Sequence, residues 1–129
     1  MDSIEQVREK FKNDRFATDC GCEIDEIGDK YAKCHLALCD MHKNAMGDLM
    51  GGVSFTLSDF AFAIASNWQG TPTVSLCSNI TFLGKAKGDV IFAEAKCKKD
   101  GRTACYYEIS VTDNLDNKIA EVTINGFHV

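Results

Sequence analysis

The strongest hydrophobic pattern lies in residues 42–67. This segment begins as a loop with several glycines and continues as a predicted helix of roughly four turns. Apolar side chains recur there at the three- and four-residue spacing of a helical face, and Phe55 and Phe62 add a second apolar strip. A helix that is apolar on almost every side is normally enclosed by its protein. The pattern therefore predicts a buried central helix. Its main stripe consists of Val53, Leu57, Phe60, Ala61, Ile64 and Trp68.

Asp59 is the single charged residue of that helical stretch. Aspartate is a poor residue for a helix interior, and a buried carboxylate is costly unless it has partners or its pKa rises. An aspartate at such an unfavourable position indicates a candidate functional residue. The alternative interpretation is a solvent-facing carboxylate on a helix that is less enclosed than the pattern suggests.

Alternating apolar and polar residues with turn signals between them predict the remaining elements. Asp100-Gly101 is a strong hairpin signal, and consecutive strands joined by short turns favour an antiparallel meander. A wholly apolar helix must then lie against the concave face of that sheet. We expect an α+β fold in one domain, residues 1–129, with an antiparallel sheet of five to six strands wrapped around one long helix. The predicted elements are a helix at 3–13 and strands at 20–27, 30–39, 73–83, 90–98, 103–112 and 118–127.

The composition narrows the partners and the compartment. A formal net charge of -5 argues against nucleic acid or a membrane surface as the main partner. The N-terminal segment is a charged helical pattern without the apolar core of a signal peptide, and no apolar run approaches the ~20 residues of a membrane span. We expect a cytoplasmic protein.

Seven cysteines are present, and most are expected to be free structural thiols in a reducing compartment. Cys20, Cys22, Cys34 and Cys39 suggest a metal site at first sight, but the C-x-C spacing lacks the paired C-x-x-C knuckles of zinc sites. The three histidines show neither metal spacing nor a nucleophile partner. We therefore expect no metal and no Ser-His-Asp arrangement.

The residues around the predicted helix resemble the hotdog-fold acyl-CoA thioesterases, in particular the phenylacetate-pathway (PaaI-like) group. That group has an asparagine six residues before an HGG motif and an acidic residue nine positions after its histidine. Here Asn44 precedes Met50-Gly51-Gly52, and Asp59 follows at the matching distance. The resemblance covers nearly the whole chain after about residue 20. It continues through Val74-Ser75, Asn79-Ile80-Thr81-Phe82, Lys85-Ala86-Lys87-Gly88-Asp89 and Gly101-Arg102-Thr103.

This resemblance implies hydrolysis of an acyl-CoA thioester, with no cofactor beyond the coenzyme A of the substrate. It implies that the Gly51 N–H binds the thioester carbonyl oxygen and that Asp59 acts as nucleophile or general base. Asn44 would polarise the carbonyl or position water, and Ser75 would lie near the attacking group. Each has a plain structural alternative: a tight helix entry for Gly51-Gly52, a turn for Asn44 and an ordinary strand residue for Ser75.

Two features bear on assembly and on substrate binding. A helix N-terminus suits an oxyanion, but Asp59 lies roughly 12 Å along the axis from Gly51, so one helix cannot bring both groups to one carbonyl. Two antiparallel copies can, and we expect a homodimer with shared sites that assembles into a tetramer. The predicted coenzyme A surface contains Met50, Gly52, Lys85, Lys87, Arg102 and Thr103, with Lys98 and Lys99 in adjoining turns, unless these turns are simply solvated.

Position 50 leaves a rival function open. The group usually has histidine there, and the thioether of Met50 cannot donate the hydrogen bond that a histidine would. A protein that binds acyl-CoA or a related ligand without hydrolysing it is therefore the alternative. A hotdog hydratase is a weaker one, because the chain lacks an Asp and a His five residues apart at the helix start.

Overall fold

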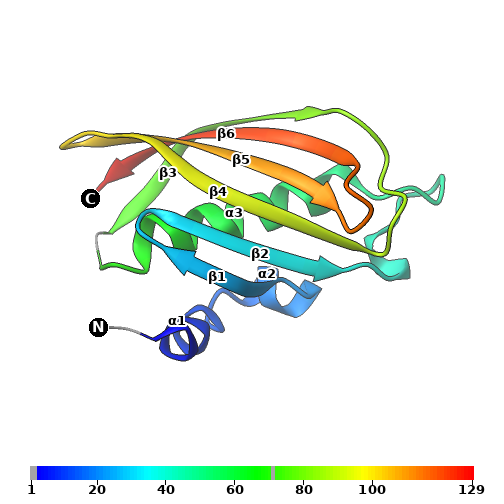
Figure 1. Ribbon diagram of the computed structural model, residues 1–129, viewed down its shortest axis with the longest axis horizontal. Helices are drawn as coiled ribbons and strands as arrows, with labels where there is room; N and C mark the ends of the chain where they lie inside the picture. The colour runs from blue at the N-terminus through cyan, green and yellow to red at the C-terminus, as the bar shows by residue number, and fades with distance from the viewer. Residues whose placement is uncertain (1–2, 71) are drawn as a thin grey trace.

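A six-stranded antiparallel sheet curves around helix α3 (Gly51–Asn67) in the computed structural model, which describes residues 3–70 and 72–129 (Figure 1). This is the predicted hotdog arrangement, and it is confirmed. The strands, in the sheet order β1-β2-β4-β5-β6-β3, are β1 (Glu23–Gly28), β2 (Tyr31–Ala37), β4 (Val90–Asp100), β5 (Ala104–Asp113), β6 (Lys118–His128) and β3 (Thr73–Phe82). The short helices are α1 (Ile4–Phe11), α2 (Arg15–Cys20) and the 3-10 turn η1 (Asp40–His42).

The predicted meander holds only for β4, β5 and β6. Strand β3 does not lie beside β4, which follows it in the sequence, but pairs with β6 from Thr73↔His128 to Phe82↔Ala120. Strand β4 instead pairs with β2. Short turns fix only hairpin neighbours. The pairing of β3 with β6, and that of β2 with β4, depends on which strand edges remain available after the sheet has closed over α3.

The N-terminal region also differs from the prediction. A strand was expected from Cys20, but residues 15–20 form α2, and β1 begins at Glu23. Gly21 ends α2 in the left-handed conformation, with φ of 116°. Six residues make fewer than two helical turns, too short a stretch for a helical period to emerge from the sequence.

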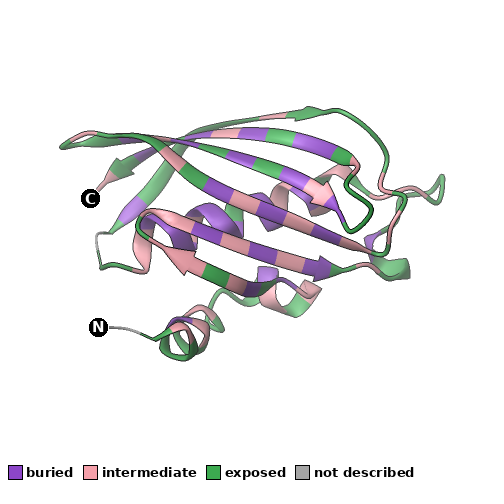
Figure 2. Ribbon diagram, viewed as in Figure 1, coloured by how far each residue is buried: buried purple, intermediate pink, exposed green. Residues whose placement is uncertain are grey.

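The core lies between the concave face of the sheet and α3, and buried residues alternate with half-buried or exposed ones along β4, β5 and β6 (Figure 2). Phe62 of α3 packs edge-on against Tyr107 at a centroid distance of 5.2 Å. One side of α3 nevertheless remains uncovered, because Gly52 and Asp59 are exposed. The expectation of complete enclosure is therefore wrong for a single chain: the sheet covers only part of the helix circumference.

Strand β3 forms an edge of the sheet and is exposed along most of its length. A bulge between Ser75 and Cys77 interrupts its regular alternation. Four large apolar residues on or directly after it are solvent-exposed: Val74, Leu76, Phe82 and Leu83. A long apolar edge strand is a template for pairing with another chain.

Among the described residues, no helix has the length and apolarity needed to cross a membrane.

Candidate active site

A cleft of about 280 Å³ opens at the N-terminus of α3. One wall is the loop that leads into the helix, and the other is the end of β3 with the turn that follows it. Lys85 from that turn and Asp48 from the loop form an ion pair with an Nζ–Oδ2 distance of 3.4 Å. The cleft is lined by Asp48, Leu49, Gly51, Ser54, Phe82, Gly84, Lys85, Ala86 and Ile119.

Two backbone N–H groups at the start of α3 are unpaired. Met50 is the N-cap residue in an extended conformation, and its carbonyl accepts a hydrogen bond from Val53 N at 3.0 Å. The N–H groups of Gly51 and Gly52 have no acceptor within the described residues. Such N–H groups, together with the helix dipole, favour an anion or a developing oxyanion.

Gly51 is also required by its close packing against Phe82. A Cβ atom added to Gly51 would lie 2.6 Å from Phe82 Cζ. The phenylalanine ring therefore covers one side of the helix start and forms part of the cleft wall. Glycine at position 51 is therefore consistent both with a tight entry into the helix and with an N–H that binds the substrate.

Asn44 organises the loop before the helix. Its side-chain oxygen accepts hydrogen bonds from Met46 N at 2.9 Å and Asp48 N at 3.1 Å, which is an Asx-type turn. Asn44 is exposed and does not line the cleft. In the single chain this geometry supports the turn role, and the catalytic role of Asn44 stays a prediction.

His42 anchors this loop; its place in the sequence put it close to the loop, but the sequence did not indicate its partners. It is buried, with Nδ1 accepting from Cys39 N at 3.0 Å and Nε2 at 2.7 Å from the Cys20 carbonyl. An amide can only donate and a carbonyl can only accept, so the ring is neutral with its proton on Nε2. Met50 N in turn donates to the His42 carbonyl at 2.9 Å. The histidine thus ties the helix start to the N-terminal region.

Asp113 holds the turn on the other wall of the cleft. Its buried carboxylate accepts backbone hydrogen bonds from Lys87, Gly88, Leu115 and Asn117, as well as from the Asn117 side chain. Burial alone would raise the pKa of Asp113, but the hydrogen bonds from Asn117, Gly88 and Lys87 outweigh it and hold the pKa well below the ordinary aspartate value. Asp113 therefore fixes the turn that carries Lys85.

Replacing Asp113 with asparagine is expected to lower the free energy of unfolding at pH 7 by about 1–3 kcal/mol, because several N–H donors lose a charged acceptor. A depressed folded-state pKa means that the ionised group stabilises the fold above about pH 3.9, its unfolded value. That contribution is lost as pH falls toward the folded-state pKa. Urea unfolding at several pH values should show the gap between wild type and Asp113→Asn closing below about pH 4. A gap that is the same at every pH would contradict this.

Asp59 lies on the uncovered side of α3, away from the cleft of its own chain. Partial burial raises the pKa of its carboxyl, and the negative charge of Asp14, at the start of α2, adds to this effect. A raised pKa makes the carboxylate a stronger base than an ordinary aspartate. The side chain makes no hydrogen bond to another described residue.

With Asp59 as the base that the resemblance implies, Asp14→Asn is expected to move the acid limb of the kcat/KM profile to lower pH. A general base works only when deprotonated, so activity falls as pH drops through its pKa, and loss of the Asp14 charge lowers the pKa of Asp59. The check is a pH–rate profile of both proteins on one acyl-CoA. Asp19→Asn is a suitable control, because Asp19 is also exposed on α2 but pairs with Arg15 at 3.5 Å. An unmoved limb in Asp14→Asn would contradict the prediction.

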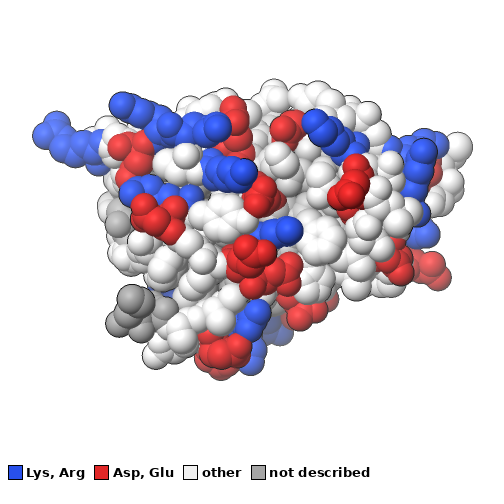
Figure 3. All heavy atoms as spheres, in the orientation of Figure 1, with Lys and Arg blue, Asp and Glu red and all other residues white. Residues whose placement is uncertain are grey.

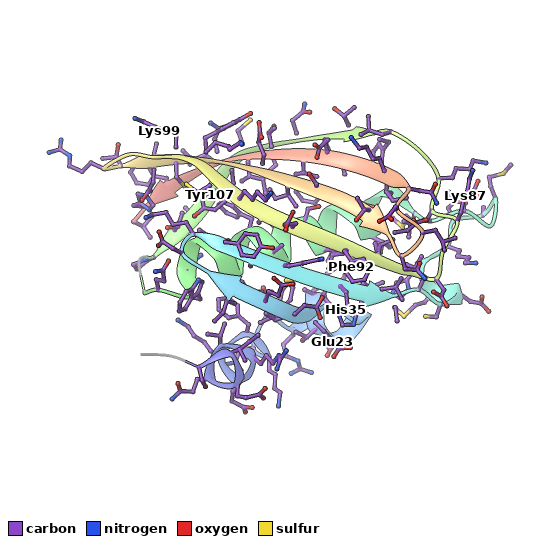
Figure 4. All side chains as sticks on the ribbon, in the orientation of Figure 1. Glu23, His35, Lys87, Phe92, Lys99 and Tyr107 are labelled. Atoms are coloured by element: carbon purple, nitrogen blue, oxygen red, sulfur yellow. The ribbon has the colours of Figure 1, made fainter. Side chains whose placement is uncertain are left out.

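The structure separates the remaining predicted site residues. Lys87 and Lys99 are at opposite ends of the molecule (Figure 4), because Lys87 precedes β4 and Lys99 lies near the far end of that strand rather than in a turn. Arg102 and Thr103 follow β4 at the same end as Lys99. The expected single basic cluster in adjoining turns is therefore wrong for one chain. Basic groups gather instead at both ends of the face in Figure 3.

Ser75 lies far from the cleft of its own chain. Phe82 is seven positions further along the strand, roughly 23 Å away. It is exposed and makes no hydrogen bond through its side chain within the described residues. Its predicted role near the attacking group stays a prediction that one chain alone does not fulfil.

His128 has partners that the sequence did not reveal. Its Nδ1 lies 2.8 Å from Thr73 Oγ1, and its Nε2 lies 2.7 Å from Asp100 Oδ1. The hydroxyl belongs to a threonine, so this set is not the Ser-His-Asp arrangement whose absence was expected from the sequence. The three residues come from β3, β4 and β6, which explains why no local motif indicated them.

Comparison with known proteins agrees with this architecture. A model of the thioesterase superfamily matches residues 46–120. The acyl-coenzyme A thioesterase PaaI of Escherichia coli is 28% identical over 111 residues, covering 85% of this chain and 79% of that protein. Its solved structure matches with a TM-score of 0.91 at 24% identity, over 98% of this chain and 92% of that chain. A hypothetical thioesterase of Streptococcus pneumoniae, solved with coenzyme A, matches with a TM-score of 0.84 at 24% identity, over 92% and 96%. The family match spans more than half of the chain and contains both the helix start and Asp59, so the chain belongs to the thioesterase superfamily.

Proposed function

We propose that this protein hydrolyses acyl-CoA thioesters to a free acid and coenzyme A. The observation that carries the proposal is the unbonded N–H group of Gly51, which lines a cleft at the start of the helix that also bears Asp59. The match to a protein named acyl-coenzyme A thioesterase and the neighbour solved with coenzyme A support this substrate class.

The chemistry follows from these groups. The Gly51 N–H donates a hydrogen bond to the thioester carbonyl oxygen and stabilises the negative charge that develops on it. The Asp59 carboxylate removes a proton from a water molecule as the water oxygen attacks the carbonyl carbon. Collapse of the tetrahedral intermediate breaks the C–S bond, and the proton held by Asp59 passes to the departing thiolate. The products are the acid and the free thiol.

This reaction requires two copies of the chain. Asp59 is eight residues beyond Gly51, roughly 12 Å along α3 and on another side of it, so the two groups of one chain do not meet. Strand β3 supplies an edge that no other described strand covers and that carries exposed apolar side chains. A second copy that pairs antiparallel along β3 brings its own Asp59 and Ser75 toward Gly51 of the first. We propose this dimer, with two shared sites, as the minimal active unit and a tetramer as a pair of such dimers.

The dimer makes Leu76→Glu a strong perturbation. Leu76 is 65% exposed on β3, and a carboxylate there would be buried without a partner at the proposed interface. We expect the variant to become monomeric by light scattering and to lose its activity. Leu115→Glu is the matched control, since Leu115 is 61% exposed in the turn between β5 and β6. An active Leu76→Glu monomer would refute the shared site.

Coenzyme A release from a panel of acyl-CoAs tests the function directly. The panel should contain short, medium and long chains together with phenylacetyl and hydroxybenzoyl groups. Products should be separated by chromatography, because the exposed free thiols of Cys39 and Cys77 would react with thiol dyes. Turnover of at least one member supports the proposal. Tight saturable binding without turnover would instead establish the rival, a ligand-binding protein.

Met50 is the feature that favours this rival. It is 52% exposed at the N-cap of α3, where its thioether offers no hydrogen-bond donor to a substrate. Met50→His is then the variant in which to look for turnover. The seven free thiols support a reducing compartment, and we propose the cytoplasm.

A further inference from the structure

One polar side chain inside the cleft has no partner. Helix α3 carries four hydroxyl side chains, and three of them bond to the carbonyl four residues earlier: Thr56 to Gly52 O at 2.8 Å, Ser58 to Ser54 O at 2.9 Å, and Ser66 to Phe62 O at 2.7 Å. The fourth, Ser54, makes no such bond and has no other side-chain partner among the described residues. Ser54 is only 1% exposed, and it lines the cleft.

Buried polar side chains are normally hydrogen-bonded, and the small exposed area of Ser54 must include its hydroxyl oxygen, because among the described residues the one fully buried side-chain N or O atom without a partner is Asp25 Oδ2. Ser54 is set apart from Ser58, which is equally buried but satisfied within the helix. The difference is that Ser54 faces the cleft and Ser58 is not among its lining residues. The hydroxyl of Ser54 is therefore available to a ligand in the cleft.

The position of Ser54 relative to Gly51 determines how far apart two polar atoms of a ligand must be to bind both residues. Ser54 is three residues beyond Gly51, roughly 4.5 Å along the helix axis. Side chains on a helix lean toward its N-terminus, so the hydroxyl is directed back toward the free N–H groups. A ligand oxygen at the Gly51 N–H and a second polar atom at the Ser54 hydroxyl are then only a few bonds apart.

The rest of the cleft is small and mainly apolar around this hydroxyl. Leu49, Phe82, Ala86 and Ile119 supply apolar lining, and the volume of about 280 Å³ lies at the low end for ligand pockets. Ser54 is the only polar side chain of the cleft, apart from the ion-paired Asp48 and Lys85.

On the basis of the proposed thioesterase function, we propose that Ser54 determines acyl specificity: its hydroxyl binds an oxygen on carbon 3 of the acyl group while the Gly51 N–H holds the thioester carbonyl oxygen. The site then selects 3-hydroxyacyl or 3-oxoacyl thioesters over those that lack this oxygen. In an acyl group with oxygen on carbon 3, the two oxygens are separated by only three carbon atoms, which matches the spacing of the two donors.

The test compares kcat/KM for butyryl-CoA and for each enantiomer of 3-hydroxybutyryl-CoA, in wild type, Ser54→Ala and Ser58→Ala. In wild type, kcat/KM for one enantiomer of 3-hydroxybutyryl-CoA should exceed kcat/KM for butyryl-CoA by roughly threefold to tenfold, the effect of one neutral hydrogen bond. In Ser54→Ala this ratio should fall to about one, whereas Ser58→Ala removes an equally buried hydroxyl and should keep the wild-type ratio.

The ratio distinguishes this role from a structural one, because a loss of folding lowers both rates together. A ratio that is unchanged in Ser54→Ala, or that falls equally in Ser58→Ala, would overturn the specificity role while leaving the thioesterase function intact. A wild-type protein that prefers butyryl-CoA would do the same. Absence of turnover on all members of the wider panel would instead overturn the thioesterase function itself, and the specificity role with it.

Discussion

Asp59→Asn is expected to lower kcat on the best acyl-CoA substrate by roughly 10²–10⁴-fold, the usual contribution of a positioned general base. Asparagine has nearly the same shape but cannot take a proton from water. Asp59 is exposed in the single chain and bonds to no other side chain there, so its replacement should leave the fold unchanged. Steady-state kinetics with chromatographic product analysis, together with thermal unfolding, measures both effects.

Asp19→Asn provides the comparison for this variant, since it removes an exposed carboxylate from α2 at no proposed site. It should retain wild-type activity. If Asp59→Asn kept more than about a tenth of the wild-type kcat, Asp59 would not be the base, because such a loss is below the range for general base catalysis. The shared-site argument, which depends on Asp59, would then fail as well.

The fold was largely predictable because its strongest signals are local. The period of α3 and the alternation along β4, β5 and β6 report burial that repeats within one element, and the Asp100-Gly101 turn fixes the β4–β5 hairpin. Strand β3 was located in the sequence but not in the sheet. Its place at the far edge depends on pairing with β6, some forty residues later, which no turn signal encodes.

The site was predictable to the same extent. Gly51 and Asp59 belong to one local motif, and the structure places the unbonded N–H groups where the motif implied them. Asp113 and His42 support the two walls of the cleft through partners more than twenty residues away, so no spacing revealed them. The lysines of the predicted coenzyme A surface show the opposite kind of error, a contact that was predicted and is absent from the described chain. Turns that are close in sequence were assumed to be close in space, but a full strand separates them.

Removing the Gly51 N–H is expected to lower kcat by roughly 10²–10³-fold, the effect of deleting one oxyanion donor. Proline at this position removes the donor and little else. It is favoured at the first residue of a helix, and the preceding Met50 has the extended conformation that a residue before proline adopts. No hydrogen bond within the described chain is lost, because the Gly51 N–H has no acceptor there.

The Phe82 ring must be removed in the same experiment, because it would lie 2.6 Å from any Cβ at residue 51. The informative comparison is thus between Gly51→Pro/Phe82→Ala and Gly51→Ala/Phe82→Ala. Both gain a Cβ and lose the ring, and only the first loses the N–H. Equal kcat values in the two double variants would show that this N–H does not stabilise the transition state.

The same variants decide whether the two catalytic groups come from different copies. A hybrid dimer of Asp59→Asn with Gly51→Pro/Phe82→Ala, co-expressed with two tags and purified through both, contains one site with both lesions and one site with neither if the sites are shared. About half of the wild-type activity should then return, although each parent alone is nearly inactive. If each chain carried its own complete site, both sites of the hybrid would be damaged and no activity would return. The 12 Å or so between Gly51 and Asp59 along one helix favours the first result.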